Sequence, residues 1–282
     1  MNGRGPRAAK GKQEMLLQLL GWIWPSAKEE VFHLRERLRY GRQFGNLQDR
    51  FWRDHFAPHP PRVLSGPFQG MKYLRGTVMG PPLPRWLGTY ETELHELIRS
   101  TLLTKAYELI LVVGSAEGYY ASGLSRLFPR TRILSFEGTA FSRWQQKRLL
   151  AMNRVTNVEV RGRLEIPEFR RLANNKKSFC LLDVEGAEAD FCGKDSWPWL
   201  TQTDLLVEIH AAGSQSPEEV LQMLRTGLDA THRTVVLEHA QRDLAQIKKS
   251  AGLKWSLEEL RDAAEEHRGF DQKWLWAEAK AS

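Results

Sequence analysis

Residues 108–118 constrain the fold of this chain more than any other stretch. Leu109 to Val113 are apolar without interruption, which is typical of a parallel strand covered by helices on both faces. Gly114 and Gly118 bracket the turn that follows, and it presents backbone N–H groups at a helix N-terminus, so we expect a nucleoside-containing ligand there. The spacing Gly-x-x-x-Gly differs from the dinucleotide fingerprint Gly-x-Gly-x-x-Gly, so a turn that binds no ligand is the alternative.

The rest of the chain repeats this pattern of an apolar run followed by helical spacing. Strands are expected at 131–137, 157–161, 179–183, 205–210, 234–238 and 273–277. Helices are expected at 89–103, 119–128, 140–152, 165–172, 217–228, 244–249 and 257–266, with Thr89 as an N-cap. Alternating strands and helices predict an α/β fold built on one doubly wound sheet.

Polar side chains stand where the predicted strands end. Glu137 ends the second strand, 19 positions beyond Gly118, where a carboxylate can accept hydrogen bonds from the two ribose hydroxyls of a bound nucleoside. The later strands add a group of four acids and one histidine: Asp183, Glu185, Glu188, Glu208 and His210. In open α/β sheets ligands bind outside the carboxyl ends of the strands, so we expect these side chains to share one rim with Gly114 and Glu137.

The formal net charge of +7 is concentrated in the N-terminal segment. Residues 1–80 hold 14 Lys and Arg against 6 Asp and Glu, a surplus of +8. We expect a basic helical extension at 1–57, disordered over 1–12, then a Pro/Gly-rich connecting segment at 58–88 that covers the cleft, and a catalytic domain at 89–282. Residues 13–56 are interpreted as an amphipathic helix pair that docks on the domain; contact with lipid headgroups or with nucleic acid is the alternative.

Two cysteines, Cys180 and Cys192, lack metal-ligand spacing and are expected to be reduced structural residues of a cytoplasmic protein. Residues 15–24 are too few to span a membrane, and they make a poor secretory signal because polar and tryptophan residues interrupt them. We therefore expect no transmembrane segment, and at most peripheral membrane contact through the N-terminal segment.

The motifs together resemble the FkbM-type family of S-adenosylmethionine-dependent methyltransferases, which have the class I fold. The resemblance rests on three stretches: Gly114-Ser-Ala-Glu-Gly-Tyr-Tyr, Phe136-Glu137, and Leu182-Asp-Val-Glu-Gly-Ala-Glu with Val207-Glu-Ile-His downstream. It implies a sheet of about seven strands with the last one antiparallel, S-adenosyl-L-methionine as cofactor, and methylation of hydroxyl groups on sugars, glycans or other secondary metabolites.

The resemblance also implies roles for particular residues. The turn would line the methionine and ribose side of the cofactor through Gly114, Ser115, Ala116 and Gly118. Glu137 would hold the ribose, Arg163 or Leu164 would neighbour the adenine, and Asp183 would face the methionine amine with Glu185 alongside. The family usually has an acid where this chain has Val112, so Asp183 or Glu117 would have to supply the missing negative charge.

The chemistry of methyl transfer to a hydroxyl requires a group that accepts its proton. His210 is the expected general base, because its ordinary pKa lies near neutrality, with Glu208 or Glu185 as orienting or alternative base. No resident metal is expected, although Asp183, Glu185 and Glu208 are the hard ligands that Mg²⁺ prefers. The alternatives are a non-catalytic cofactor- or partner-binding module that retains the methyltransferase fold, and a nicotinamide-dependent oxidoreductase. The acceptor is expected to be a small molecule or glycan rather than nucleic acid.

Overall fold

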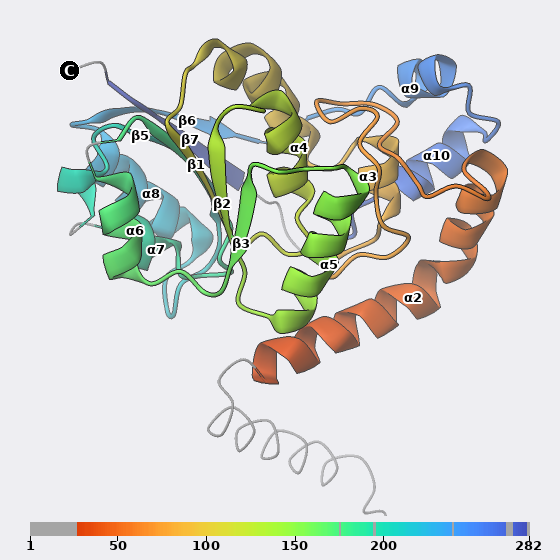
Figure 1. Ribbon diagram of the computed structural model, residues 1–282, viewed down its shortest axis with the longest axis horizontal. Helices are drawn as coiled ribbons and strands as arrows, with labels where there is room; N and C mark the ends of the chain where they lie inside the picture. The colour runs from red at the N-terminus through yellow and green to blue at the C-terminus, as the bar shows by residue number, and fades with distance from the viewer. Residues whose placement is uncertain (1–26, 175, 194–195, 239, 269–272, 281–282) are drawn as a thin grey trace, which may run out of the picture.

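The protein is built around a mixed seven-stranded sheet with helices on both faces (Figure 1). The computed structural model describes residues 27–282 except 175, 194–195, 239, 269–272 and 281–282. The strand order is β3-β2-β1-β4-β5-β7-β6, and β7 is antiparallel to both of its neighbours. The strands are β1 (Leu109–Val113), β2 (Arg132–Phe136), β3 (Val158–Arg161), β4 (Ser178–Leu182), β5 (Thr203–Ile209), β6 (His232–Leu237) and β7 (Lys273–Ala279). The expected doubly wound α/β sheet of about seven strands, the last antiparallel, is confirmed.

The register of the parallel strands brings the predicted rim residues to one level. Val113 is paired with Phe136 on one side and with Leu182 on the other, and Leu182 is paired with Val207. The residues that follow these four are therefore neighbours at the carboxyl edge. They are Glu137, Gly114, Asp183 and Glu208.

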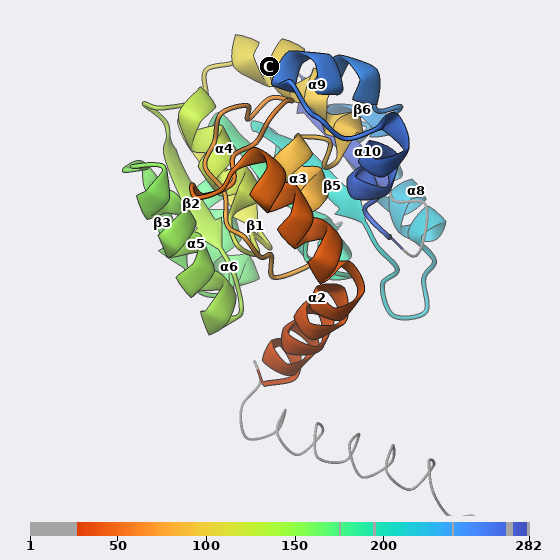
Figure 2. The same ribbon diagram turned by 90° about the vertical axis from the view of Figure 1, so that its right-hand side faces the viewer.

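Helices cover the two faces of the sheet as the apolar strands require (Figures 1 and 2). One face carries α4 (Tyr119–Leu127), α5 (Ala140–Met152), α9 (Leu244–Ala251) and α10 (Leu257–Ala264). The other carries α6 (Ile166–Ala173), α7 (Glu188–Cys192) and α8 (Pro217–Leu228). Alternate residues of β1 enter the two cores, Ile110 and Val112 on the first face and Leu109, Leu111 and Val113 on the second.

The N-terminal segment forms one long helix, α2 (Ala27–His55), that joins the first face at its C-terminal end. Phe51 is fully buried there, with its ring 4.8 Å from that of Trp255 and 6.3 Å from that of Trp86. The expected helix pair is thus a single continuous helix in the described residues; the predicted disorder at 1–12 and the rest of the pair lie outside them.

The Pro/Gly-rich segment after α2 packs in the same core. Phe68, Met71, Tyr73 and Trp86 are buried, and the short helix α3 (Leu83–Leu87) lies in this segment. Within the described residues, no helix is long and apolar enough to cross a bilayer.

The prediction of a regular helix at 89–103 is wrong. The chain instead forms 3-10 turns at Thr92–Leu94 and Leu102–Thr104, with a π-helical turn at Leu97–Thr101 between them. Thr89 is no N-cap, because its hydroxyl donates to the carbonyl of Pro84. The left-handed backbone of Glu91 breaks the helix at its first turn and turns that side chain into the protein.

Candidate functional site

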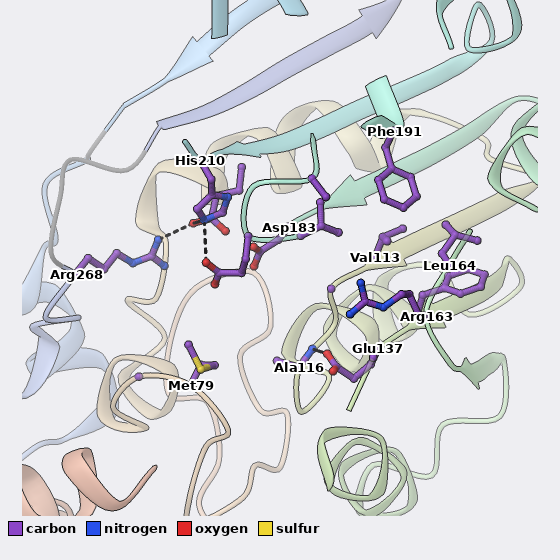
Figure 3. Close-up of a pocket in the computed structure, with 18 of the residues that line it drawn as sticks. Met79, Val113, Ala116, Glu137, Arg163, Leu164, Asp183, Phe191, His210 and Arg268 are labelled. Atoms are coloured by element: carbon purple, nitrogen blue, oxygen red, sulfur yellow. Dashed lines mark hydrogen bonds and ion pairs between the residues drawn. The ribbon is translucent and has the colours of Figure 1, made fainter. Parts of the chain in front are cut away.

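A cavity of about 870 Å³ opens at the carboxyl edge of β1, β2, β4 and β5. Its lining comes from strand ends together with the Met79–Pro81 stretch, Arg39 of α2 and the segment that carries Arg268. Figure 3 shows Glu137, Arg163 and Leu164 at one end, Arg268 and His210 at the other, and Asp183 between them. The cavity therefore joins the rim residues that the sequence placed together to segments far away in the chain.

The turn after β1 needs glycine at both of its bracketing positions. Gly114 has a φ of +80°, and a Cβ there would lie 1.5 Å from the carbonyl oxygen of Asp183. Gly118 has a φ of +90°, and a Cβ there would lie 2.6 Å from Cγ of Gln146. The turn thus runs directly against the residue that follows β4, which places Gly114 and Asp183 on the same wall.

The carboxylate of Glu137 holds this turn from the β2 side. Its Oε2 accepts a hydrogen bond of 2.9 Å from the backbone N–H of Ala116, whose own φ is +44°. Its Oε1 accepts from the backbone N–H and the hydroxyl of Thr139 at 2.8 and 3.0 Å. Glu137, Ala116, Arg163 and Leu164 all line the cavity.

Other residues of the turn face elsewhere. Gly114 and Ala116 line the cavity, whereas Ser115 and Gly118 pack toward Gln146 of α5. The expectation that Glu117 supplies negative charge to the cofactor is not met by its side chain. It is 1% exposed and accepts hydrogen bonds from the Tyr73 hydroxyl and from the backbone N–H of Val78 at 3.0 Å. Arg85 lies 3.4 Å from the same carboxylate, so Glu117 anchors the Pro/Gly-rich segment instead.

Val112 does not face the cavity either. Its side chain lies in the core under α4, and it is 1% exposed. An acid at this position would be buried among apolar groups in the structure, so the substitution Val112→Asp is expected to destabilise the fold rather than to tighten ligand binding.

Asp183 and Glu208 form a pair of neighbouring acids at the ends of β4 and β5. Burial raises the pKa of Asp183 to about 7, although a hydrogen bond with Glu208 opposes the shift. Burial and the charge of Asp183 raise the pKa of Glu208 well above its ordinary value. Oδ1 of Asp183 is buried without a hydrogen-bond partner in the described residues. A cationic donor in the cavity would stabilise this pair.

His210 is oriented by a carboxylate at the start of α7, which follows β4. Its Nδ1 lies 2.7 Å from Oε1 of Glu188, and its Nε2 lies 3.6 Å from Glu185 and 4.0 Å from Glu208. Because a carboxylate only accepts hydrogen bonds, the proton sits on Nδ1, and neutral His210 then carries its lone pair on Nε2. Burial lowers the pKa of His210, but the hydrogen bond to Glu188 and the charges of Asp183, Glu188 and Glu185 raise it above the ordinary value.

Glu188 is the site residue that the predicted catalytic set left out. It is 0% exposed, and its Oε1 also accepts from the backbone N–H groups of Val184 and Gly186 at 3.3 and 3.2 Å. Burial raises its pKa, yet the hydrogen bond from His210 outweighs burial with the help of backbone donors, and the net shift is downward. The sequence places Glu188 on the rim, but its pairing with His210 depends on the path of the loop.

Arg268 closes the other end of the cavity. No motif or periodicity in the sequence indicates that it belongs to the site. Its guanidinium lies 3.2 Å from Glu208, donates to Glu266 at 2.8 Å, and pairs with Glu91. The arginine also lies 5.2 Å above the Tyr90 ring. Glu208 and Glu91 lie 60 and 177 residues from Arg268 in the chain, so neither spacing nor periodicity could have joined them.

The structure groups a different set of possible Mg²⁺ ligands from the set expected from the sequence. One ligand atom each from Asp183, Glu185 and His210 lies within 4.8 Å of the others, whereas Glu208 is paired with Arg268. The three ligand atoms lie no closer together than expected for a histidine that is surrounded by hydrogen-bonding acids. A role for His210 as a metal ligand would also compete with its role as a base.

The sheet topology defines the fold class. The strand order, the antiparallel β7, the glycine turn after β1 and the acid after β2 are those of the class I methyltransferase fold. No family model and no curated protein sequence matches the chain.

Solved structures that resemble the protein include methyltransferases. One is the O-methyltransferase TomG from Streptomyces achromogenes, in complex with S-adenosylmethionine, at 12% identity over 68% of this chain and 81% of that one, with a TM-score of 0.46. Another is the O-methyltransferase from Bacillus cereus in complex with S-adenosylhomocysteine, at 12% identity over 64% and 77%, with a TM-score of 0.42. The fold is assigned on the sheet topology.

Proposed function

We propose that the protein is an S-adenosylmethionine-dependent O-methyltransferase. The observation that carries the proposal is the pair of acids at the two sides of the glycine turn, both lining one cavity. In this proposal Glu137 would accept hydrogen bonds from the ribose hydroxyls, and the carboxylate of Asp183, which lines the same cavity, would pair with an ammonium group. S-adenosylmethionine offers both groups, and Arg163 and Leu164 would neighbour its adenine. The proposal implies an intracellular, cytoplasmic setting, where this cofactor is available.

The residues at the other end of the cavity fit an acceptor hydroxyl. The bound cofactor supplies an activated methyl group, so the protein must hold the acceptor oxygen in line and exclude water. Neutral His210 accepts the hydroxyl proton at Nε2, while Glu188 keeps the other ring proton in place. Glu185 and Glu208 lie beside Nε2, where each can accept a hydrogen bond from the acceptor.

The acceptor class proposed is a hydroxyl on a sugar, a glycan or another secondary metabolite. Its support is the FkbM-type resemblance together with a wall of carboxylates, which are strong acceptors for clustered hydroxyl groups. A resident metal is not part of the proposal, and EDTA is expected to leave turnover unchanged.

The test is methyl transfer to polyol and glycan acceptors with the substitution His210→Gln. The exposed residue His59 offers a matched control, His59→Gln. We expect His210→Gln to lower kcat at least about a hundredfold while S-adenosylhomocysteine binding is retained. Unchanged turnover in this variant would remove His210 from the mechanism.

A non-catalytic module with the same fold is the second candidate, because neither Val112 nor Glu117 gives the cavity a negative charge. Such a module would bind S-adenosylhomocysteine but transfer no methyl group to any hydroxyl acceptor class. Turnover with one acceptor would reject it.

A further inference from the structure

The C-terminal half of helix α2 is docked on the protein. The residues near its C-terminal end pack on the protein, with Phe51 buried and the guanidinium of Arg75 lying 4.0 Å above the ring of Trp52. Figures 1 and 2 both show the N-terminal half extending past the body, on the side to which the carboxyl edge of the sheet points. Four of the described side chains in this half are exposed, and they offer a surface for another role.

The extending half displays leucine and arginine side by side. Leu34 is 46% exposed and Leu38 is 50% exposed, and their four-residue spacing places them on one face. Arg35 and Arg39 are exposed next to them. A short aliphatic stripe flanked by arginine is typical of a helix that lies in a membrane interface, where the arginine heads reach the phosphates.

The start of α5 lies on the same side of the molecule in both views. Trp144, in the first turns of α5, is 53% exposed, and Arg148 lies 4.7 Å from its ring. Tryptophan beside arginine is the pair that membrane–water interfaces favour. Two elements far apart in the sequence thus present interfacial side chains to one side.

We propose that the exposed half of α2, at Leu34, Arg35, Leu38 and Arg39, binds an anionic lipid surface. Arg39 also lines the cavity, so a lipid surface bound here lies at the cavity mouth. The exposed Arg35 and Arg39 give the charge complementarity, within an N-terminal stretch whose residues 1–80 carry a surplus of +8. The inference concerns lipid binding alone and stands whether or not the cavity transfers methyl groups.

Two other occupants fit the surface less well. Nucleic acid is bound through stacked aromatic rings, but Phe51 and Phe56 near the end of the helix are buried and Trp52 is covered by Arg75. A second copy would set Arg35 and Arg39 against the same residues, with like charges repelling. Nucleic acid also makes no use of the exposed leucines, whereas a lipid surface uses both the leucines and the arginines.

The experiment is co-sedimentation of the full chain with vesicles. Phosphatidylcholine vesicles with and without phosphatidylserine are compared, in low and high salt. We expect binding to the anionic vesicles only, weakened by salt. The double substitution Leu34→Gln with Leu38→Gln, and separately Arg35→Gln with Arg39→Gln, should each lower the partition coefficient about tenfold or more. Trp144→Gln should lower it by a smaller factor.

The matched control changes two leucines that are equally exposed elsewhere. Leu103 is 45% exposed and Leu257 is 46% exposed, and Leu103→Gln with Leu257→Gln should bind vesicles as the unchanged protein does. Equal binding by the Leu34/Leu38 variant would overturn the proposal. So would arginine-dependent RNA binding that the leucine substitutions leave intact, or a dimer that those substitutions dissociate while vesicle binding persists. Circular dichroism confirms that each variant is folded.

Discussion

At the scale of single residues, the carboxylate of Glu188 decides which nitrogen of His210 can act. Its 2.7 Å contact with Nδ1 fixes the ring and turns Nε2 toward Glu185 and Glu208. Because a base must be neutral and the pKa of His210 is raised, methyl transfer should increase with pH up to a point above pH 6.5, the ordinary value.

Replacing Glu188 by glutamine should separate positioning from a merely structural role. Glutamine can still accept from Nδ1, but it removes the charge that raises the pKa of His210. We expect the acidic limb of the kcat/KM profile to move to lower pH and the plateau to fall about tenfold, because a weaker base is a poorer catalyst. A profile that falls in height without moving along the pH axis would show that Glu188 acts only on folding.

The raised pKa of Asp183 should make the stability of the protein depend on pH in a definite direction. Its pKa in the folded chain is about 7, above that of an unfolded aspartate, so the folded state binds the proton more tightly. The stability from this proton is complete below the unfolded pKa and is lost as pH rises through 7. In the absence of ligand, Asp183→Asn should therefore raise Tm relative to the unchanged protein at pH 8, and by less at pH 5.

The control for this measurement is Asp229→Asn, at an exposed aspartate after α8. Its Tm should follow that of the unchanged protein at both values of pH. The Asp183 variant should also lose affinity for S-adenosylhomocysteine, which would show that the buried charge is kept for binding. Parallel Tm curves for the Asp183 variant and the unchanged protein would contradict the argument.

At the scale of elements, the turn between β1 and α4 is the part that tolerates least change. A Cβ on Gly114 would lie 1.5 Å from a backbone oxygen, which no side-chain rotation can relieve. Adding about 1–2 kcal/mol for left-handed backbone to about 1–3 kcal/mol for overpacking, Gly114→Ala should lower the free energy of unfolding by about 2–5 kcal/mol.

Urea unfolding measures this cost, with Gly76→Ala as the control. A Cβ on Gly76 meets nothing within 4 Å, and its φ is not in the left-handed region, so its free energy of unfolding should change little. A Gly114 variant as stable as the control would mean that the turn has another conformation and that its contact with Asp183 is not required.

Elements whose apolar runs are long and local were predictable from sequence. The helices at Ala140–Met152 and Pro217–Leu228 have the expected bounds, and every expected strand is present within two residues at each end. The break in the helix expected at 89–103 could not be predicted from the sequence. It depends on Glu91, whose side chain is turned inward by its pairing with Arg268, a tertiary contact. Glu137, Asp183 and His210 were found because strand ends share an edge, whereas Arg268 and the anchoring of Glu117 depend on segments without periodic signals.

At the scale of the whole molecule, the cavity lies where the α/β sheet, the Pro/Gly-rich segment and α2 meet. The Pro/Gly-rich segment is anchored by Glu117, and Met79, Gly80 and Pro81 line the cavity above the glycine turn. Two acids lie on either side of that turn, and the histidine lies toward the acceptor end. The central claim is that this cavity binds S-adenosylmethionine.

Calorimetric titration with S-adenosylhomocysteine and, separately, with NAD⁺ tests that claim most directly. The account predicts binding of S-adenosylhomocysteine and not of NAD⁺, weakened about tenfold or more by Glu137→Gln because a charged acceptor for the ribose hydroxyls is lost. Glu165→Gln, at an exposed acid that lines the same cavity, is the comparison and should weaken binding less. Binding of NAD⁺ in preference, or of neither compound, would contradict the account.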